Sequence, residues 1–165
     1  MSLKRALRHL ALPGWVVRRH FPDDMLTRIE ASIRASEGAH RGEIGIAIEG
    51  GLEPAQLWRG VTPRQRALDA FASLGIWDTE ENTGVLIYIQ FADHAVEIVA
   101  DRGIDRHVAQ SEWDAICRAL EAHFKCGDYA GGCEAAVKRI GELIEVHFPK
   151  GTDNPDELPN RPVIL

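Results

Sequence analysis

Side chains that could bind a metal ion lie in two short segments of this 165-residue chain. The first segment carries Asp78, Glu80 and Asn82, so a spacing of two places three oxygen-bearing side chains in one loop. The second segment carries Asp101 and Asp105. Ca²⁺ takes about six to eight oxygen ligands and tolerates irregular loops, whereas Mg²⁺ demands stricter geometry. These five residues are therefore candidate ligands of a divalent cation, with Ca²⁺ favoured over Mg²⁺.

The elements around the two segments predict that the segments meet. Alternating isoleucines predict a strand over 43–49, and the apolar run over 84–91 predicts a second strand at the centre of a sheet. A tight turn over 92–94 then returns the chain as an antiparallel strand over 95–100. A strand–helix–strand crossover makes the first two strands parallel. The start of the second strand and the end of the third strand therefore share one end of the sheet, where Glu81 adds another carboxylate.

Two observations count against a metal site in this loop. With Asp78 at position 1 of a calcium loop, Thr83 replaces the glycine of the sharp turn and Ile89 replaces the final glutamate. The acids also lie at the amino ends of the parallel strands, whereas open α/β sheets bind ligands at the carboxyl ends. The alternative is a solvated acidic loop in which Asp78 caps a turn and Asp101 pairs with Arg102.

The sequence offers no clear catalytic nucleophile and no pattern for an organic cofactor. Cys133 and Arg139 have the spacing of a cysteine phosphatase, but the stretch is helical and Cys133 falls on its apolar stripe. The seven histidines show no zinc-ligand spacing. Arg102 and His107 are the groups near the acidic segments that could face a phosphate or another substrate.

The hydrophobic pattern predicts an α/β fold. A small mixed sheet, with a parallel strand–helix–strand unit and one antiparallel hairpin strand, lies between helical layers in a three-layer α-β-α sandwich. The expected helices cover residues 3–12, 23–38, 62–75, 111–124 and 128–148, and residues 50–61 are expected to be an irregular connection. We divide the chain into a basic helical arm (1–20), a central domain (21–148) and a proline-rich extended tail (149–165).

The charge of the chain is uneven. The chain carries 19 basic and 25 acidic side chains, yet residues 1–22 hold five of the basic ones and no acid. The remaining acidic body should repel nucleic acid. The arm is a candidate contact for an anionic membrane or a protein partner. No apolar run is long enough to span a membrane as a helix, and we expect a cytoplasmic protein, peripheral at the membrane if the arm binds there.

Four motifs give the chain a resemblance to a known family. They occupy residues 67–77 (AxxxFxxLGIW), 82–88 (NxGVLIY), 96–104 (VEIVADRGI) and 124–132 (FxxGDYxxG). They resemble the TPM domain family, whose members are often labelled TPM phosphatases, over residues 21–148. The resemblance implies a three-layer α-β-α fold. It also implies that relatives include acid phosphatases, calcium binders, and proteins tied to the assembly or maintenance of membrane complexes.

The chain departs from the family pattern in ways that indicate a short, soluble bacterial branch. It has neither the export signal nor the C-terminal membrane or glycine-rich segment common in the family, and residues 100–103 (ADRG) replace a glycine-rich turn. Three functions follow. The first is a divalent-cation-binding and protein-interaction module linked to membrane or envelope complexes. The second is a metal-assisted phosphomonoesterase, in which Asp78 and Asp101 hold the metal and Arg102 faces the phosphate. The third is a purely structural partner protein.

Overall fold

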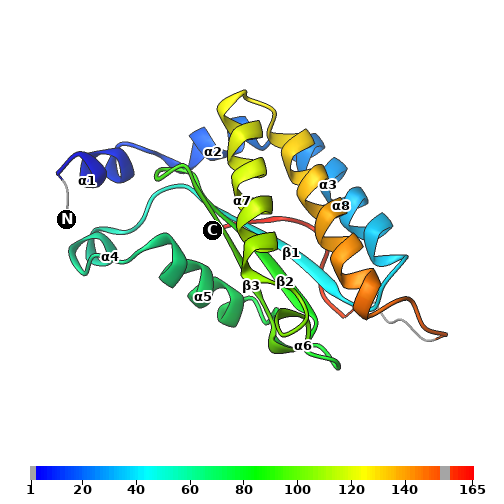
Figure 1. Ribbon diagram of the computed structural model, residues 1–165. Coiled ribbons are helices and arrows are strands. Elements are labelled where there is room, and N and C mark those ends of the chain that lie inside the picture. The colour runs from blue at the N-terminus through cyan, green and yellow to red at the C-terminus, as the bar shows by residue number, and fades with distance from the viewer. Residues whose placement is uncertain (1–2, 153–156) are drawn as a thin grey trace.

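The computed structural model describes residues 3–152 and 157–165 (Figure 1). Within these residues the chain forms eight helices and four strands. In chain order they are α1 (Leu3–Leu10), α2 (Gly14–His20), α3 (Asp23–Glu37), β1 (Glu43–Glu49), α4 (Pro54–Trp58), α5 (Pro63–Ser73), β2 (Gly84–Gln90), β3 (Ala95–Ala100), α6 (Arg102–Asp105), α7 (Gln110–Lys125), α8 (Tyr129–His147) and β4 (Val163–Ile164).

The four strands form one mixed sheet in the order β3-β2-β1-β4. β1 and β2 are parallel, with Glu43 opposite Gly84 and Glu49 opposite Gln90. β2 and β3 form the predicted antiparallel hairpin, with Val85 opposite Ala100. The predicted topology of the three main strands is confirmed.

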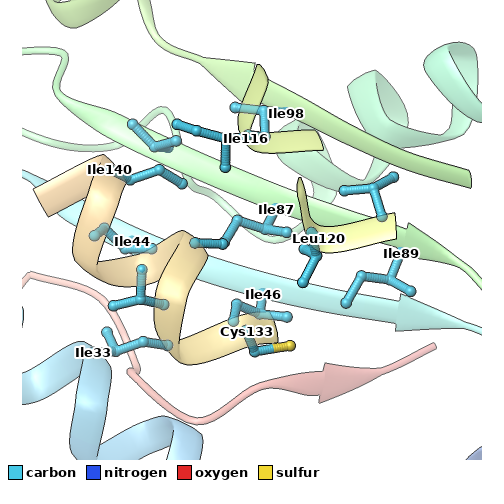
Figure 2. Packing of buried hydrophobic residues seen from close by; sticks show 14 of the residues in the cluster. Ile33, Ile44, Ile46, Ile87, Ile89, Ile98, Ile116, Leu120, Cys133 and Ile140 are labelled. Atoms are coloured by element: carbon cyan, nitrogen blue, oxygen red, sulfur yellow. The ribbon is translucent and has the colours of Figure 1, made fainter. Parts of the chain in front are cut away.

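Helices α3, α7 and α8 cover one face of the sheet, and α5 lies on the other face (Figure 1). The isoleucines of β1 point toward the three-helix layer, as Figure 2 shows for Ile44 and Ile46. The residues that fill this main core include Ile33, Ile87, Ile89, Ile98, Ile116, Leu120, Cys133 and Ile140. Cys133 is thus a core residue, as its place on the apolar stripe predicts. The fold is the predicted mixed α/β sandwich.

On the second face of the sheet, α5 packs mainly against β3 and β2. The small residue Ala47 of β1 lies in the same smaller core cluster as Ala67 and Ala70 of α5. A capping box fixes the start of α5: the Thr62 hydroxyl accepts from the Gln65 amide at 3.2 Å, and the Gln65 side chain accepts from the Thr62 amide. The sequence pattern of this helix start is reproduced in full.

Two local features differ from the expectation. The helix expected over 3–12 is present as α1 and ends before Pro13, but a further helix, α2, opens at Gly14 and was not expected. The connection over 50–61 is not wholly irregular, because α4 begins after Glu53 with Pro54 at its first position and its own capping box. The described residues include no helix with the length and apolar character needed to cross a bilayer.

The end of the C-terminal tail docks on the body. Val163 and Ile164 pair in parallel with Ala47 and Ile48 as β4, and the Leu165 amide donates to the Ile48 carbonyl at 2.9 Å. No sequence pattern predicts this strand, because two residues are too few to show a periodicity.

Candidate functional site

The structure brings the two acidic segments together at one end of the sheet. We call this region, loop 77–83 with segment 101–105, the acidic edge. The Gly103 amide donates to the Asn82 carbonyl at 2.9 Å, and Arg102 Nε donates to Asn82 Oδ1 at 3.2 Å. Only glycine fits at position 103, because a Cβ there would lie 2.3 Å from the carbonyl oxygens of both Glu81 and Asn82. The loop and α6 are therefore in direct backbone contact.

Two buried threonines hold loop 77–83 against the sheet. The Thr83 amide donates to Thr79 Oγ1 at 2.9 Å, and the Thr83 hydroxyl donates to the Arg41 carbonyl at 3.2 Å. Arg41 Nη1 in turn lies 2.8 Å from Glu81 Oε1. The loop is thus fixed from within, and its acidic side chains are left on the outside.

The five candidate ligands have different surroundings. Asp101 accepts from the Arg102 amide at 2.7 Å and caps α6, so its partner is the Arg102 backbone and not the guanidinium. Asn82 accepts from Arg102 and has a left-handed backbone with φ of 56°. The carboxylates of Asp78, Glu80 and Asp105 are exposed and form no hydrogen bond or ion pair within residues 3–152 and 157–165.

These oxygens do not converge on one point. In the described part of the chain, no three His, Cys, Asp or Glu side chains lie close enough together to hold a metal ion. Shared coordination would need the exposed carboxylates to change rotamer, which surface side chains do readily. The metal site at the acidic edge therefore stays a prediction.

The tail reaches the acidic edge and adds a carboxylate to it. Glu157 Oε2 accepts from the Glu80 amide at 3.0 Å. The Glu157 and Leu158 amides both donate to the Glu43 carboxylate, at 3.1 and 3.3 Å. Glu43 is buried at the start of β1, so these contacts tie the tail to the sheet. Asp156, the other tail acid within reach in the sequence, lies outside the described residues.

His107, a candidate substrate contact, faces the end of α8. Its ring stacks on His147 with centroids 5.0 Å apart and planes 19° apart, and it meets Phe148 edge-on at 5.9 Å. Arg102, the other candidate, is exposed and uses only its Nε for Asn82. The role of both residues in binding a phosphate or substrate stays a prediction.

A cavity of about 370 Å³ lies at the opposite end of the sheet, beside the turn between β2 and β3. We call it the aromatic pocket. Phe91, Phe124 and Tyr129 form its apolar wall. The Tyr129 ring contacts Phe124 at 5.0 Å and Phe91 at 6.0 Å between centroids. The pocket therefore lies near the carboxyl end of β2, where ligands of open α/β sheets bind.

Polar groups line the rim of the aromatic pocket. Glu121 Oε1 accepts from the Val96 amide at 3.2 Å, so one oxygen of that carboxylate is already used. Lys125 follows Glu121 by one helical turn but forms no ion pair or hydrogen bond with the described residues. His94 is exposed, with φ of 52° in the hairpin turn. The rim thus offers an unpaired ammonium group beside an aromatic wall.

The turn between α7 and α8 places two of the three rings. Gly127 takes a φ of 77°, and Asp128 then caps α8 by accepting from the Gly131 amide at 3.0 Å. His123 Nδ1 lies 2.9 Å from Asp128 Oδ2, and this hydrogen bond holds the pKa of Asp128 below its ordinary value. The helices expected over 111–124 and 128–148 bracket this turn, but no sequence pattern predicted the pocket. The sequence feature that marks the pocket is an aromatic residue at an end of each element around it: Phe91 after β2, Phe124 near the end of α7 and Tyr129 at the start of α8.

A buried polar network lies beneath the carboxyl end of β1. Arg66 of α5 donates to both oxygens of Glu49, at 2.6 and 3.0 Å, and the Tyr88 hydroxyl donates to Glu49 Oε2. Gln90 Nε2 lies 3.1 Å from the Tyr88 oxygen. Burial raises the pKa of Tyr88 far above its ordinary value, and the Glu49 carboxylate adds to the effect. Each polar group therefore has a partner, and the network joins α5 to the sheet.

Ser36 and His40 form a pair that resembles a nucleophile and its base. Ser36 Oγ lies 3.1 Å from His40 Nε2, in the groove between α3 and α8. The Gly42 amide donates to His40 Nδ1, so the ring proton belongs on Nε2, which then donates to Ser36. Burial lowers the pKa of His40, which keeps it neutral. In this tautomer His40 cannot accept a proton from the serine.

The arrangement is that of a small mixed α/β domain with an acidic edge and an aromatic pocket at opposite ends of its sheet. The sequence model of the TPM domain matches residues 20–143. The chain therefore belongs to the TPM domain family, as its motifs predict.

Two solved structures resemble the fold. The BA42 protein from the psychrophilic bacterium Bizionia argentinensis is 30% identical, with a TM-score of 0.76 over 86% of this chain and 93% of that chain. The N-terminal domain of the cg2496 protein from Corynebacterium glutamicum is 15% identical, with a TM-score of 0.54 over 82% and 80%. The second likeness concerns the fold alone. None of the curated proteins matches this chain.

Proposed function

We propose that this TPM domain is a protein-interaction module that holds a large apolar side chain of its partner in the aromatic pocket. The observation that carries this proposal is the cavity of about 370 Å³ with its wall of three aromatic rings. Ligand pockets typically measure about 300–1,000 Å³ and combine an apolar lining with a few placed polar groups. The pocket has the size for one side chain and its flanking backbone.

The rim favours a partner with a negative charge close to the apolar side chain. Lys125 has no partner in the described residues, whereas Glu121 is partly satisfied by the Val96 amide. An aromatic ring on the wall of Phe91, Phe124 and Tyr129 would gain about 0.5–1.5 kcal/mol from ring contacts beyond its burial. The ammonium group of Lys125 would then favour a partner that carries a negative charge beside its aromatic side chain.

The test compares two probes that differ by one charge. N-acetyltryptophan carries a carboxylate and N-acetyltryptophan amide does not. We expect both to shift the amide resonances of residues 89–95 and 121–129, and we expect the carboxylate form to bind more tightly. Lys125→Ala should remove the difference between the probes. Ala95→Leu should fill the pocket and abolish binding of both, whereas Ala115→Leu on the exposed face of α7 should change neither. Shifts confined to other segments would contradict the proposal.

A second candidate function is divalent-cation binding at the acidic edge. The contact between loop 77–83 and α6 supports it, because three exposed carboxylates, Asp78, Glu80 and Asp105, come from these two adjoining segments. Glu157 of the tail approaches the same loop. A hard cation would relieve their mutual repulsion, and Ca²⁺ tolerates the irregular geometry better than Mg²⁺ does.

Chelator-treated protein should be titrated with CaCl₂ and with MgCl₂ while amide resonances are followed. Saturable shifts in residues 78–84 and 101–107 are expected with calcium, and they should weaken in Asp78→Asn and Asp105→Asn but not in the control Asp24→Asn on α3. The absence of shifts at millimolar calcium would refute the cation site. Turnover of p-nitrophenyl phosphate that depends on calcium, Asp78 and Asp101 would favour the phosphomonoesterase, with exposed Arg102 as its phosphate contact.

A further inference from the structure

Helix α1 turns a stripe of leucines toward solvent. Leu3, Leu7 and Leu10 are 75, 58 and 60% exposed. Their spacing of four and three residues places them on one side of the helix. Ala6 and His9, on the inner side, are buried. The helix therefore has a covered inner face, which carries Ala6 and His9, and an apolar outer face that the described part of the chain does not cover.

Two tryptophans extend the apolar character of this region. Trp15 near the start of α2 is 63% exposed, and Trp58 at the end of α4 is 83% exposed. α4 is in contact with α1, so Trp58 belongs to the same region of the molecule. Figure 1 shows α1, α2 and α4 at the side of the molecule where the β2–β3 turn lies. Isolated exposed apolar residues are ordinary, but a leucine stripe with neighbouring tryptophans marks an interaction surface.

The charged side chains of α1 and α2 are all positive. Lys4, Arg18 and Arg19 are exposed and form no ion pair or hydrogen bond within residues 3–152 and 157–165. Arg8 is half-exposed and lies 3.2 Å from Asp93. Because residues 1–22 contain no acid, the surface of the two helices is basic on a protein whose net charge is −6.

The inner face of α1 is fixed, so the leucines cannot turn inward. Arg5 donates to Asp93 from Nε and Nη2, at 2.8–3.1 Å. The Leu52 amide donates to His9 Nδ1 at 2.9 Å, which places the ring proton on Nε2, 3.0 Å from Asp93 Oδ1. The Asp93 carboxylate in the hairpin turn thus orients the helix on the body.

We propose that the leucine stripe of α1, with Trp15, Trp58 and the unpaired cations Lys4, Arg18 and Arg19, docks on an anionic lipid bilayer. A helix with an apolar stripe beside basic residues lies in the plane of the membrane interface. Tryptophan rings favour the headgroup level. Charge complementarity identifies a lipid surface as the occupant: a negative leaflet attracts the basic helices, and salt screens the acidic body over about 8 Å. This surface is separate from the aromatic pocket and from the acidic edge.

The test is sedimentation of the full chain with vesicles of phosphatidylcholine alone or mixed with phosphatidylserine. Binding is expected only with phosphatidylserine, and it should fall sharply near 1 M salt, where the screening length is about 3 Å. Each cation removed should weaken binding about fivefold, so Arg18→Gln with Arg19→Gln should weaken it about 25-fold. Leu3→Ser, Leu7→Ser and Leu10→Ser together should abolish it.

Matched controls keep the test specific. Val146 on α8 is 74% exposed and Trp77 is 53% exposed, so Val146→Ser and Trp77→Phe remove apolar surface elsewhere and should leave vesicle binding unchanged. Far-ultraviolet circular dichroism checks that each variant keeps its helices. Full binding by the triple serine variant would overturn the proposal. So would self-association that the serines suppress without any vesicle binding, because the stripe would then belong to a second copy of the chain.

Discussion

Arg64 Nη1 donates a hydrogen bond of 2.5 Å to the carbonyl of Ile98, on the open side of the terminal strand β3. The Glu121 carboxylate occupies the Val96 amide on the same strand. Unpaired strand edges are templates for pairing with other chains, and these two side chains from α5 and α7 block such pairing. The helices therefore protect the edge as well as cover the faces of the sheet.

Arg64→Ala should expose the Ile98 carbonyl and promote self-association. We expect a loss of about 1 kcal/mol in the free energy of unfolding, with more oligomer at high concentration. Urea denaturation and light scattering measure the two effects. Arg118→Ala on α7 is the control, since Arg118 is exposed and forms no hydrogen bond or ion pair in the described residues. Equal behaviour of the two variants would show that Arg64 does not protect the edge.

Asp93→Asn should loosen α1 from the hairpin turn. Burial raises the pKa of Asp93, but the hydrogen bonds from Arg5 and His9 outweigh it, and the net pKa lies below the ordinary 3.8. A carboxyl group whose pKa is lowered in the folded state stabilises the fold at pH values above its pKa in the unfolded state. This contribution is lost as the pH falls below about 3.8. We expect the variant to lose about 1–2 kcal/mol of local stability at pH 7, after allowance for solvent screening.

Amide hydrogen exchange in α1 measures that local stability. Exchange should be faster in Asp93→Asn than in the wild type at neutral pH, and the difference should shrink in acid. If the difference in exchange persists unchanged well below pH 3.8, the charge of Asp93 is not its cause.

Tyr88→Phe should change the response of the protein to alkali. The pKa of Tyr88 is raised from 10.0 by burial and by Glu49, so the neutral phenol stabilises the fold below pH 10 and this contribution is lost as the pH rises above it. At pH 7 the variant should lose only about 1 kcal/mol of its free energy of unfolding, because Arg66 and Gln90 still donate to Glu49. Above pH 10 the wild type should lose stability faster than the variant, as urea denaturation across pH will show.

The three cysteines should react very differently with thiol reagents. Burial raises the pKa of both Cys117 and Cys133 to about 12, so their thiolates are scarce at neutral pH. Cys126 is exposed at the end of α7. One rapid equivalent is expected in native protein and three after denaturation, measured by 5,5′-dithiobis(2-nitrobenzoate) absorbance. Cys126→Ser should remove the rapid equivalent.

Gly103→Ala should disrupt the acidic edge. The added methyl would overlap two backbone carbonyls of the loop, and neither can move without breaking the contact between loop 77–83 and α6. We expect a loss of about 2–3 kcal/mol in the free energy of unfolding. Gly14→Ala is the control, because nothing lies within 4 Å of its Cβ position. Thermal denaturation of the two variants compares them directly.

The main architecture could be predicted because its signals are local and repeated. The isoleucines of β1, the apolar run of β2 and the Thr62–Gln65 capping box each specify an element. The right-handed crossover then fixes the parallel pairing and places loop 77–83 beside segment 101–105.

Features that depend on single long-range contacts could not be predicted. Asp93 binding to Arg5 and His9, and Glu157 binding to the Glu80 amide, join residues far apart in the chain without any periodic pattern. The aromatic pocket was missed for the same reason, since Phe91 and Tyr129 meet only in three dimensions. Charge counting identified the basic arm but could not reveal which cations Asp93 already occupies.

The seven-residue strand β2 separates the basic end of the domain from its acidic end. The strand holds the basic helices at its carboxyl end and the acidic edge at its amino end, about 23 Å apart at about 3.3 Å per residue. This distance exceeds two screening lengths in physiological salt. The domain therefore has an electric dipole, with its positive and negative ends separated by the length of β2. In the proposed membrane-bound state, the basic helices would face the lipid, and the acidic edge would lie away from it, accessible to solvent.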